Sequence, residues 1–212
     1  MTVPLFIIGC GGFGREVFSI IEALESSGSV PHPTGFIDDN PCAANLLHVA
    51  ALGTRVVGSV EDLIGRTEPF SAILAIGSAS ARESIADLLA FSPVTFPTLV
   101  HPDTTIGCDV RFGEGVVVAA GSRLSTNIQI GRHVQIDQNA VVGHDCNLGD
   151  FSRLNPQTCV SGTVTIGRGA LVGANATVLQ GLHVGDRTII GAGSCVVKDI
   201  PDDATVKGVP AR

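Results

Sequence analysis

The sequence predicts two structural units in succession: a small parallel α/β unit over residues 1–100, and an all-β parallel β-helix with a C-terminal tail over residues 101–212. Three observations lead to this prediction. Strand and helix patterns alternate up to about residue 100, and from Ile106 onward an apolar residue recurs at every sixth position. The composition agrees, because the chain holds 26 glycines but only nine aromatic residues, all phenylalanine, and a narrow prism has little room for rings.

The first hundred residues alternate between short apolar runs and amphipathic segments, which is the pattern of parallel strands joined by helices. Ser59 followed by Asp62 forms a capping box and predicts the start of a short helix. Residues 39–54 carry no strong signal and are expected to form a loop or a short helix. We expect strands at residues 3–8, 35–38, 71–77 and 94–99, and further helices at residues 15–24 and 79–90.

All sixteen residues at six-residue intervals from Ile106 to Val196 are apolar, and glycine directly follows nine of them. Each hexapeptide supplies one strand and one tight turn, and three make a triangular coil whose apolar residues point inward. We expect Gly or Asn after the apolar residue to relieve the turn. Residues eighteen apart then stack in three columns at the edges: Thr126, His144, Gly162, Gln180 and Lys198; Arg132, Asp150, Arg168 and Asp186; and Pro156, Ala174 and Ala192.

Charge and cysteine spacing exclude several classes of protein. A net charge of −7 and a pI of about 5.2 argue against a partner such as nucleic acid or an anionic membrane, both of which need a basic face. The early apolar run at residues 3–8 is too short for a signal sequence or a membrane span, so we expect a cytoplasmic protein. The six cysteines form no CxxC pair and no zinc spacing, so we expect no metal and predict buried, reduced thiols.

A glycine-rich loop, GCGGFG at residues 9–14, follows the first predicted strand and precedes the first helix. Its backbone N–H groups and the helix N-terminus suit a pyrophosphate, and Asp38 suits ribose or base donors, as in a Rossmann-like unit. Alone the motif indicates a dinucleotide, yet the unit is half the usual size, and the glycines also fit a close-packed turn. Arg82 is expected either near a phosphate or on a helix surface.

The hexapeptide run, the stretch GHDCNLGD at residues 143–150, the ending GVPAR and the opening GCGGFGREV together resemble a known family. They are similar to the hexapeptide-repeat acyltransferases with a left-handed β-helix, in the group of sialic acid O-acetyltransferases and nucleotide-amino-sugar N-acetyltransferases of the bacillosamine and perosamine type. The resemblance implies a homotrimer that holds acetyl-CoA in the groove between neighbouring β-helices.

The HD dipeptide matches the catalytic position of this family. The resemblance implies that His144 is the general base, and a neutral imidazole suits proton removal near neutral pH. Asp145 matches the acidic neighbour that orients the ring, although it also fits a plain turn residue. Gly162, one coil along, would offer its backbone N–H to the thioester oxygen. His133 and His183 carry no motif and are expected at the surface.

The cofactor contacts also come from the resemblance. Ala174 and Ala192 match positions where the backbone contacts CoA, and Lys198, Lys207 and Arg212 supply positive charge if they are not simply solvated. Some relatives carry a second histidine nine residues after the first. This chain has Arg153 there, which cannot act as a base but still suits a hydrogen bond to the acyl group or a phosphate.

In the first unit the resemblance implies a nucleotide-sugar site rather than a dinucleotide site. Many relatives have histidine where this chain has Phe13, so one polar contact to the ligand is lost. The matching positions are Gly11, Gly12, Phe13, Asp38, Asp39 and Gly77.

Together these features predict an acetyl-CoA-dependent N-acetyltransferase that acts on a nucleotide-linked 4-amino sugar in bacterial glycan biosynthesis, by direct attack without an acyl-enzyme. O-acetylation of sialic acid or a related sugar needs nearly the same residues and remains an alternative. A third interpretation is a non-enzymatic β-helix scaffold with a nucleotide-sensing head. An NAD-dependent oxidoreductase is disfavoured, because no catalytic domain follows the glycine-rich unit.

Overall fold

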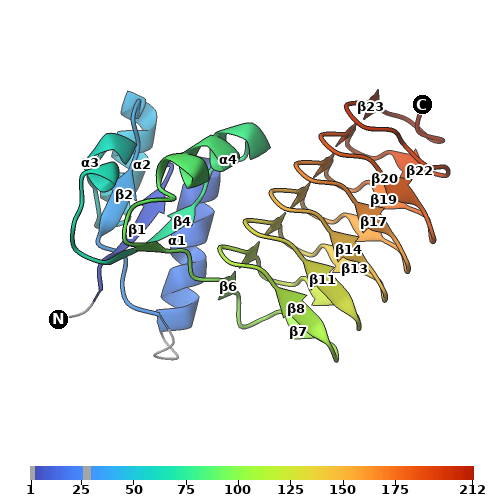
Figure 1. The fold of residues 1–212 in the computed structure, drawn as a ribbon, viewed down its shortest axis with the longest axis horizontal. Helices are drawn as coiled ribbons and strands as arrows, with labels where there is room; N and C mark the ends of the chain where they lie inside the picture. The colour runs from blue at the N-terminus through green and yellow to red at the C-terminus, as the bar shows by residue number, and fades with distance from the viewer. Residues whose placement is uncertain (1–2, 26–29) are drawn as a thin grey trace. The chain divides into compact units, whose positions relative to one another are not determined.

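The computed structural model describes residues 3–25 and 30–212, and the chain divides into two compact units. The first, Met1–Pro97, holds the alternating strands and helices, and the second, Thr98–Arg212, holds the repeats. Figure 1 shows a sheet flanked by helices in the first unit and a stack of triangular coils in the second. Over the described part of the chain, no helix is long and apolar enough to cross a membrane.

The first unit is built on a parallel five-stranded sheet in the order β3-β2-β1-β4-β5, so the predicted α/β architecture is confirmed. Chain order reverses between the central strands β1 and β4, and parallel sheets bind ligands beyond the carboxyl ends of such strands. The strands are β1 (Leu5–Ile8), β2 (Gly35–Ile37), β3 (Val56–Gly58), β4 (Phe70–Leu74) and β5 (Val94–Thr95). The helices are α1 (Gly12–Glu25), α2 (Ala43–Ala51), α3 (Val60–Ile64) and α4 (Ala79–Leu88).

Two strands of this part of the chain differ from the prediction. β3 was not expected, since its three residues are too few to establish an alternating pattern. The single strand expected at residues 94–99 is two strands, β5 in the sheet and β6 (Leu99–Val100) in the β-helix. Pro97 lies between them, and a proline has no N–H to continue a hydrogen-bonded ladder.

The capping box of α3 is confirmed. Ser59 Oγ accepts a hydrogen bond from the Asp62 N–H at 3.3 Å, and the Ser59 N–H donates to Asp62 Oδ2 at 2.7 Å. This donation lowers the pKa of the exposed Asp62 carboxyl. Together the two bonds satisfy donors that the first helical turn leaves without a partner.

The second unit is a parallel β-helix with three faces. The six-strand face holds β7 (Thr105–Ile106), β10 (Arg123–Leu124), β13 (Val141–Val142), β16 (Cys159–Val160), β19 (Thr177–Val178) and β22 (Cys195–Val196). The five-strand face holds β8 (Val110–Phe112), β11 (Ile128–Ile130), β14 (Asn147–Leu148), β17 (Thr165–Ile166) and β20 (His183–Val184). The seven-strand face holds β6, β9 (Val117–Val118), β12 (Gln135–Ile136), β15 (Arg153–Leu154), β18 (Leu171–Val172), β21 (Ile189–Ile190) and β23 (Thr205–Val206).

Neighbouring strands on each face pair in parallel with residues eighteen apart, as Val141 does with Cys159, so the predicted coil length is confirmed. The pattern begins one hexapeptide earlier than predicted, because β6 already belongs to the seven-strand face. The last coil is shorter: Ile189 pairs with Thr205, sixteen residues on.

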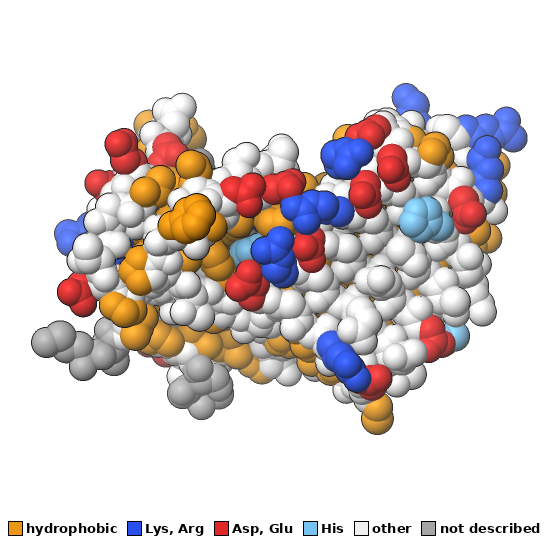
Figure 2. All heavy atoms as spheres, in the orientation of Figure 1, with side chains coloured by type: hydrophobic (Ala, Val, Ile, Leu, Met, Phe, Trp, Pro, Cys, Tyr) orange, Lys and Arg blue, Asp and Glu red, His pale blue; other side chains and the backbone are white. Residues whose placement is uncertain are grey.

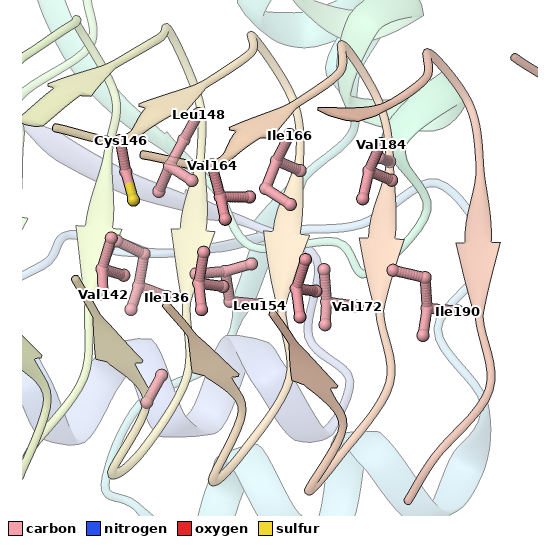
Figure 3. Close-up of a cluster of buried hydrophobic side chains, with 14 of the residues drawn as sticks. Ile136, Val142, Cys146, Leu148, Leu154, Val164, Ile166, Val172, Val184 and Ile190 are labelled. Atoms are coloured by element: carbon pink, nitrogen blue, oxygen red, sulfur yellow. The ribbon is translucent and has the colours of Figure 1, made fainter. Parts of the chain in front are cut away.

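The repeated apolar residues fill the interior of the prism. From Val118 to Val196 each of them is at most 4% exposed, and Figure 3 shows several of these side chains pointing inward from all three faces. Ile106 is an exception, with 44% of its surface exposed, because β7 is the outermost strand of its face. The inward prediction is therefore wrong for the first residue of the series.

The prediction that the turn is relieved at the residue directly after the apolar one is wrong. The third residue after the repeated apolar position, not the first, has positive φ, a conformation that costs most side chains free energy. The glycine directly after the apolar residue serves a different purpose: a Cβ at Gly143 would lie 2.6 Å from the Gly162 nitrogen in the next coil. Non-glycine residues with positive φ at these corners are Asp109, Asn127, His133, Asn139, Asp145, Phe151, Gln157, Thr163, Asn175 and Arg187.

The predicted stacking of columns is confirmed at the edge between the five-strand and seven-strand faces. Arg132 and Arg168 each make an ion pair with Asp150 at 3.2 Å. The Arg168 N–H donates to Asp186 Oδ1 at 2.8 Å in the next coil. Each column member thus hydrogen-bonds or pairs with its neighbour along the prism axis.

His133 is not at the surface as predicted. It is 1% exposed, and its ring stacks on that of Phe151, eighteen residues on, with centroids 5.1 Å apart. The His133 side chain is covered because the residue eighteen positions on, at the same corner, is also aromatic. His183, in contrast, is exposed as expected.

Replacing Gly167 by Ala should destabilise the β-helix by about 1–3 kcal/mol, the usual cost of overpacking. The new Cβ would lie 2.5 Å from the Asp186 nitrogen, which is backbone and cannot swing aside. Urea unfolding followed by circular dichroism measures the effect, since the chain has no Trp or Tyr. Gly65→Ala is the control, because its Cβ would meet nothing closer than 3.9 Å; equal midpoints for the two variants would contradict the prediction.

Candidate functional site

The first unit contains a cavity of about 450 Å³ beyond the carboxyl ends of β1, β2 and β4. This is the place where parallel α/β sheets bind their ligands. The cavity is lined by all six residues predicted for the substrate site: Gly11, Gly12, Phe13, Asp38, Asp39 and Gly77. The fold thus brings together loops that are up to 66 residues apart in the chain.

The four glycines of the loop fall into two classes. Gly9 has a φ of 105°, and a Cβ there would lie 2.8 Å from the Ala75 oxygen, while a Cβ at Gly14 would collide with the Gly9 oxygen. These two glycines serve close packing. At Gly11 and Gly12, in contrast, a Cβ would have no described atom within 4 Å, and neither residue has positive φ. Their missing side chains leave the backbone at the start of α1 open toward the cavity, as an approaching phosphate requires.

Asp38 also lines the cavity and is held firmly against the glycine-rich loop. Its Oδ2 accepts from the Cys10 N–H at 2.9 Å, and its Oδ1 accepts from the Asn40 N–H at 3.0 Å. Burial alone would raise the pKa of Asp38, but the two N–H donors outweigh it and lower the pKa. The carboxylate is therefore charged at neutral pH, and each oxygen keeps a lone pair for a ligand donor.

The neighbouring polar side chains hydrogen-bond to the protein and hold the loops around the cavity. Asp39 Oδ1 accepts from the Val60 N–H at 2.7 Å, at the start of α3. Arg15 donates to the Cys10 carbonyl at 3.0 Å and to Asn45 at 2.9 Å. Arg82 matches neither expectation: it is fully buried and donates to the carbonyls of Ile76 and Gly77 at 2.9 and 3.0 Å, so it holds the loop after β4.

In the β-helix, His144 and Asp145 lie at the corner between the six-strand and five-strand faces, the His144 edge. His144 Nδ1 lies 2.6 Å from Asp145 Oδ2, and the two side chains are 50% and 47% exposed. Asp145 Oδ1 accepts a second bond from Asn127 Nδ2 at 2.5 Å. These donations, first from Asn127 and then from His144, lower the pKa of Asp145, so the carboxylate is charged and can orient the ring.

Gly162 lies one coil along from His144 on the same edge, and the imidazole occupies the space where its side chain would be. A Cβ at Gly162 would lie 2.5 Å from His144 Nε2. The Gly162 carbonyl accepts from the Gly181 N–H at 3.0 Å, whereas its own N–H has no backbone acceptor among the described residues. That N–H is a donor beside the imidazole.

The remaining predicted cofactor residues divide between two edges. Lys198 shares the His144 edge and is exposed, three coils along, or about 14 Å at the spacing of parallel strands. Ala174, Ala192 and Lys207 lie instead at the Ala174 edge, between the seven-strand and six-strand faces. On the side of the molecule drawn in Figure 2, Lys and Arg side chains gather where the chain ends.

Arg153 lies away from the His144 edge. It lies on β15 in the seven-strand face and makes an ion pair with Asp137, with Nη2 to Oδ2 at 2.7 Å and only 16% of the Arg153 side chain exposed. The seven-strand face is the one face that does not meet the His144 edge. Arg153 and His144 of one chain are therefore not brought together.

Sequence reasoning missed three residues of these sites. Asn40 and Asn45 line the cavity but come from residues 39–54, where no periodic signal was present. Asn127 was missed although it precedes Asp145 by eighteen residues, the spacing that would have found it. In residues 3–25 and 30–212, no group of His, Cys, Asp and Glu is arranged to hold a metal ion.

Comparisons with known proteins agree with both halves of this description. The family model of the PglD N-terminal domain matches residues 4–89, and the model of the bacterial transferase hexapeptide (six repeats) matches residues 163–198. GDP-perosamine N-acetyltransferase of Escherichia coli O157:H7 is 28% identical over 157 residues, which are 74% of this chain and 69% of that protein.

Several solved structures match along the whole chain. PerB from Caulobacter crescentus, in complex with CoA and GDP-perosamine, is 32% identical with a TM-score of 0.85, over 100% of this chain and 97% of that one. The chain belongs to the hexapeptide-repeat sugar N-acetyltransferases. The acetyltransferase domain of PglB from Neisseria gonorrhoeae is 29% identical with a TM-score of 0.87, over 100% and 99% of the two chains. The predicted family, fold class, acyltransferase activity and acetyl-CoA co-substrate are confirmed.

The prediction that all cysteines of this acetyltransferase are buried is wrong. Cys42, Cys108 and Cys159 are exposed, and all six cysteines are free thiols. Cys146 is two residues from His144, but Figure 3 shows its sulfur pointing into the prism, away from the edge. Burial raises the pKa of Cys146, so no reactive thiol stands beside the imidazole.

Iodoacetamide at pH 8 should label Cys42 of the native acetyltransferase and leave Cys10 unmodified. Burial, then the hydrogen bond and charge of Asp38, raise the pKa of Cys10 to about 12. Only about one thiol in ten thousand is then ionised at that pH. Peptide mass spectrometry after timed labelling measures both sites, with urea-denatured protein as the control in which both react. Equal labelling rates in the native state would contradict the described loop.

Proposed function

We propose that the protein transfers the acetyl group of acetyl-CoA to the amino group of a nucleotide-linked amino sugar in bacterial glycan biosynthesis, in the cytoplasm. The observation that carries this proposal is the cavity of the first unit. It presents the open backbone of Gly11 and Gly12 at the α1 N-terminus, which suits phosphate. It also presents charged Asp38, which suits sugar hydroxyl or base N–H donors.

The relatives support the kind of ligand that this cavity would take. PerB was solved with CoA and GDP-perosamine together, and the PglB domain with acetyl coenzyme A. We infer a nucleoside diphosphate sugar with a free amino group for this chain. Phe13 lines the cavity with an apolar ring. The base or sugar would therefore pack against this ring and would receive no hydrogen bond from the side chain at this position.

The acetyl transfer itself is proposed to take place at the His144 edge. Asp145 accepts the Nδ1–H of His144 and leaves Nε2 free to take a proton. As the sugar amine attacks the thioester carbon, the C–N bond forms, the C–S bond breaks, and Nε2 accepts the amine proton and returns it to the leaving thiolate. In this proposal the Gly162 N–H donates to the thioester oxygen as negative charge develops there.

We infer a homotrimer with acetyl-CoA between neighbouring copies, and the positions of the proposed cofactor contacts support it. His144 and Lys198 lie on one edge of the prism, while Ala174, Ala192 and Lys207 lie on another. An acetyl-CoA molecule between two copies of the chain would contact the His144 edge of one copy and the Ala174 edge of the other. The six-strand face between these edges carries exposed apolar side chains that a second copy would cover, Val141 (41% exposed), Leu179 (42%) and Val197 (46%). A contact from Arg153 to the same ligand likewise requires another copy.

His144→Ala should reduce acetyl transfer by at least about 10²-fold, the contribution of a positioned general base, without loss of acetyl-CoA binding. Mass spectrometry of transfer to UDP-, GDP- and dTDP-linked 4-amino sugars, with free sialic acid beside them, measures the activity. His183→Ala is the matched control, since His183 is an exposed histidine of the same prism. Full turnover by the His144 variant would refute the proposal, and acetylation of sialic acid alone would favour the O-acetyltransferase alternative.

Gly12→Val should abolish nucleotide binding while the protein stays folded. Its side chain would project into the cavity, where no described atom lies within 4 Å of the Cβ position. Titration calorimetry with UDP, GDP and dTDP measures the binding, and the wild-type preference identifies the base. Gly65→Val is the control, since that glycine has a φ of −75°, no described atom closer than 3.9 Å to its Cβ position, and a place outside the cavity. Unchanged nucleotide affinity in Gly12→Val would contradict the proposal that the phosphate binds at the α1 N-terminus.

A further inference from the structure

Asn127 reaches the candidate catalytic pair from the preceding coil. It stands eighteen residues before Asp145, in the same corner column, and its Nδ2 lies 2.5 Å from Asp145 Oδ1. The other carboxylate oxygen, Oδ2, lies 2.6 Å from His144 Nδ1. One carboxylate therefore links the amide of one coil to the imidazole of the next.

The direction of both hydrogen bonds follows from the charge on Asp145. An ionised carboxylate only accepts, so the amide must present its NH₂ group and the imidazole must present Nδ1–H. Nε2 is then the nitrogen without a proton, on the side of the ring that lies over Gly162. A base needs that tautomer, and its selection by a hydrogen bond at the other ring nitrogen is a general feature of histidine chemistry.

The backbones of Asn127 and Asp145 are anchored in the same way. Its backbone N–H donates to the Cys108 carbonyl at 3.0 Å, and the Asp145 N–H donates to the Thr126 carbonyl at 3.0 Å. Both residues have positive φ, 55° and 58°. Asp145 and His144 are about half exposed, so without a second partner the carboxylate is free to rotate toward water.

We propose that Asn127 is a positioning residue for the acetyl transfer: its side-chain amide holds the Asp145 carboxylate against His144 and thereby selects the imidazole tautomer that acts as base. This proposal rests on the proposed function of His144. It is supported by the lowered pKa of Asp145, to which the bond from Asn127 contributes most.

A purely conformational role for Asn127 makes different predictions. Asparagine tolerates positive φ, and Asn139 at another corner has the same conformation, with a φ of 58°. If the backbone were the only reason for Asn127, Gly would replace it without effect. Asp would do so as well, since Asp109 and Asp145 adopt this conformation in the same column.

Steady-state kinetics of Asn127→Gly, Asn127→Asp and the control Asn139→Gly separate these roles. We expect Asn127→Gly to lower kcat about tenfold, the effect of losing a hydrogen bond to a charged group, with little change in KM for acetyl-CoA. Asn127→Asp should lose at least as much, because it adds a second carboxylate beside Asp145. Melting temperatures should match that of Asn139→Gly. Wild-type kcat in both Asn127 variants would overturn the proposal.

A double-mutant cycle tests whether Asn127 acts through Asp145. In an Asp145→Ala background, Asn127→Gly should cause no further loss of kcat, because the carboxylate that it orients is gone. Additive losses would mean that Asn127 acts by another route and would overturn the proposal.

Nitrogen-15 NMR of histidine-labelled protein gives a readout that needs no substrate. With the imidazole neutral, His144, assigned by its absence in His144→Asn, should show the Nδ1–H tautomer in wild type and a larger Nε2–H fraction in Asn127→Gly. If no amino sugar is acetylated by the wild type but this shift occurs, the proposed function fails and the positioning role stands. If the tautomer of Asn127→Gly matches that of Asn139→Gly, the positioning role fails.

Discussion

The main-chain hydrogen bonds between successive coils are the constraint on which the rest of the β-helix depends. The Asp145 N–H donates to the Thr126 carbonyl at 3.0 Å, and the Thr163 N–H donates to the His144 carbonyl at 2.7 Å. Such bonds exist only when each coil repeats the backbone path of the last. A corner residue is therefore placed by its neighbours in the two adjoining coils, and exposed side chains such as His144 gain a defined position that surface residues usually lack.

That constraint also explains which features could be predicted from sequence. The inward positions follow from the six-residue period, and the coil length and the columns follow from three such repeats, so His144 and Gly162 could be placed on one edge in advance. The conformation within a corner could not, because Gly143 and Asp145 each fit a tight turn by composition. Only the structure separates the close approach of coils at Gly143 from the positive φ at Asp145.

The first unit shows the same limit. Gly11, Gly12 and Asp38 were expected to meet, since the loops after parallel strands lie at one end of a sheet. The place of Arg82 was misjudged, and the partner of Arg153 was not foreseen, because an arginine in a sequence reveals its charge but not its partners. Arg82 is occupied by two carbonyls and Arg153 by the Asp137 carboxylate. Partners of this kind come from packing that has no local signature.

The eighteen-residue coil sets a rule for how such a chain can change length. Insertion of one whole coil between His144 and Lys198 would lengthen the His144 edge and leave every residue on its face. Insertion of a single hexapeptide would keep the core pattern intact yet move every later residue to the next edge, so Lys198 would leave the His144 edge. Length variation that preserves chemistry must therefore come in steps of three hexapeptides, although the fold alone tolerates one.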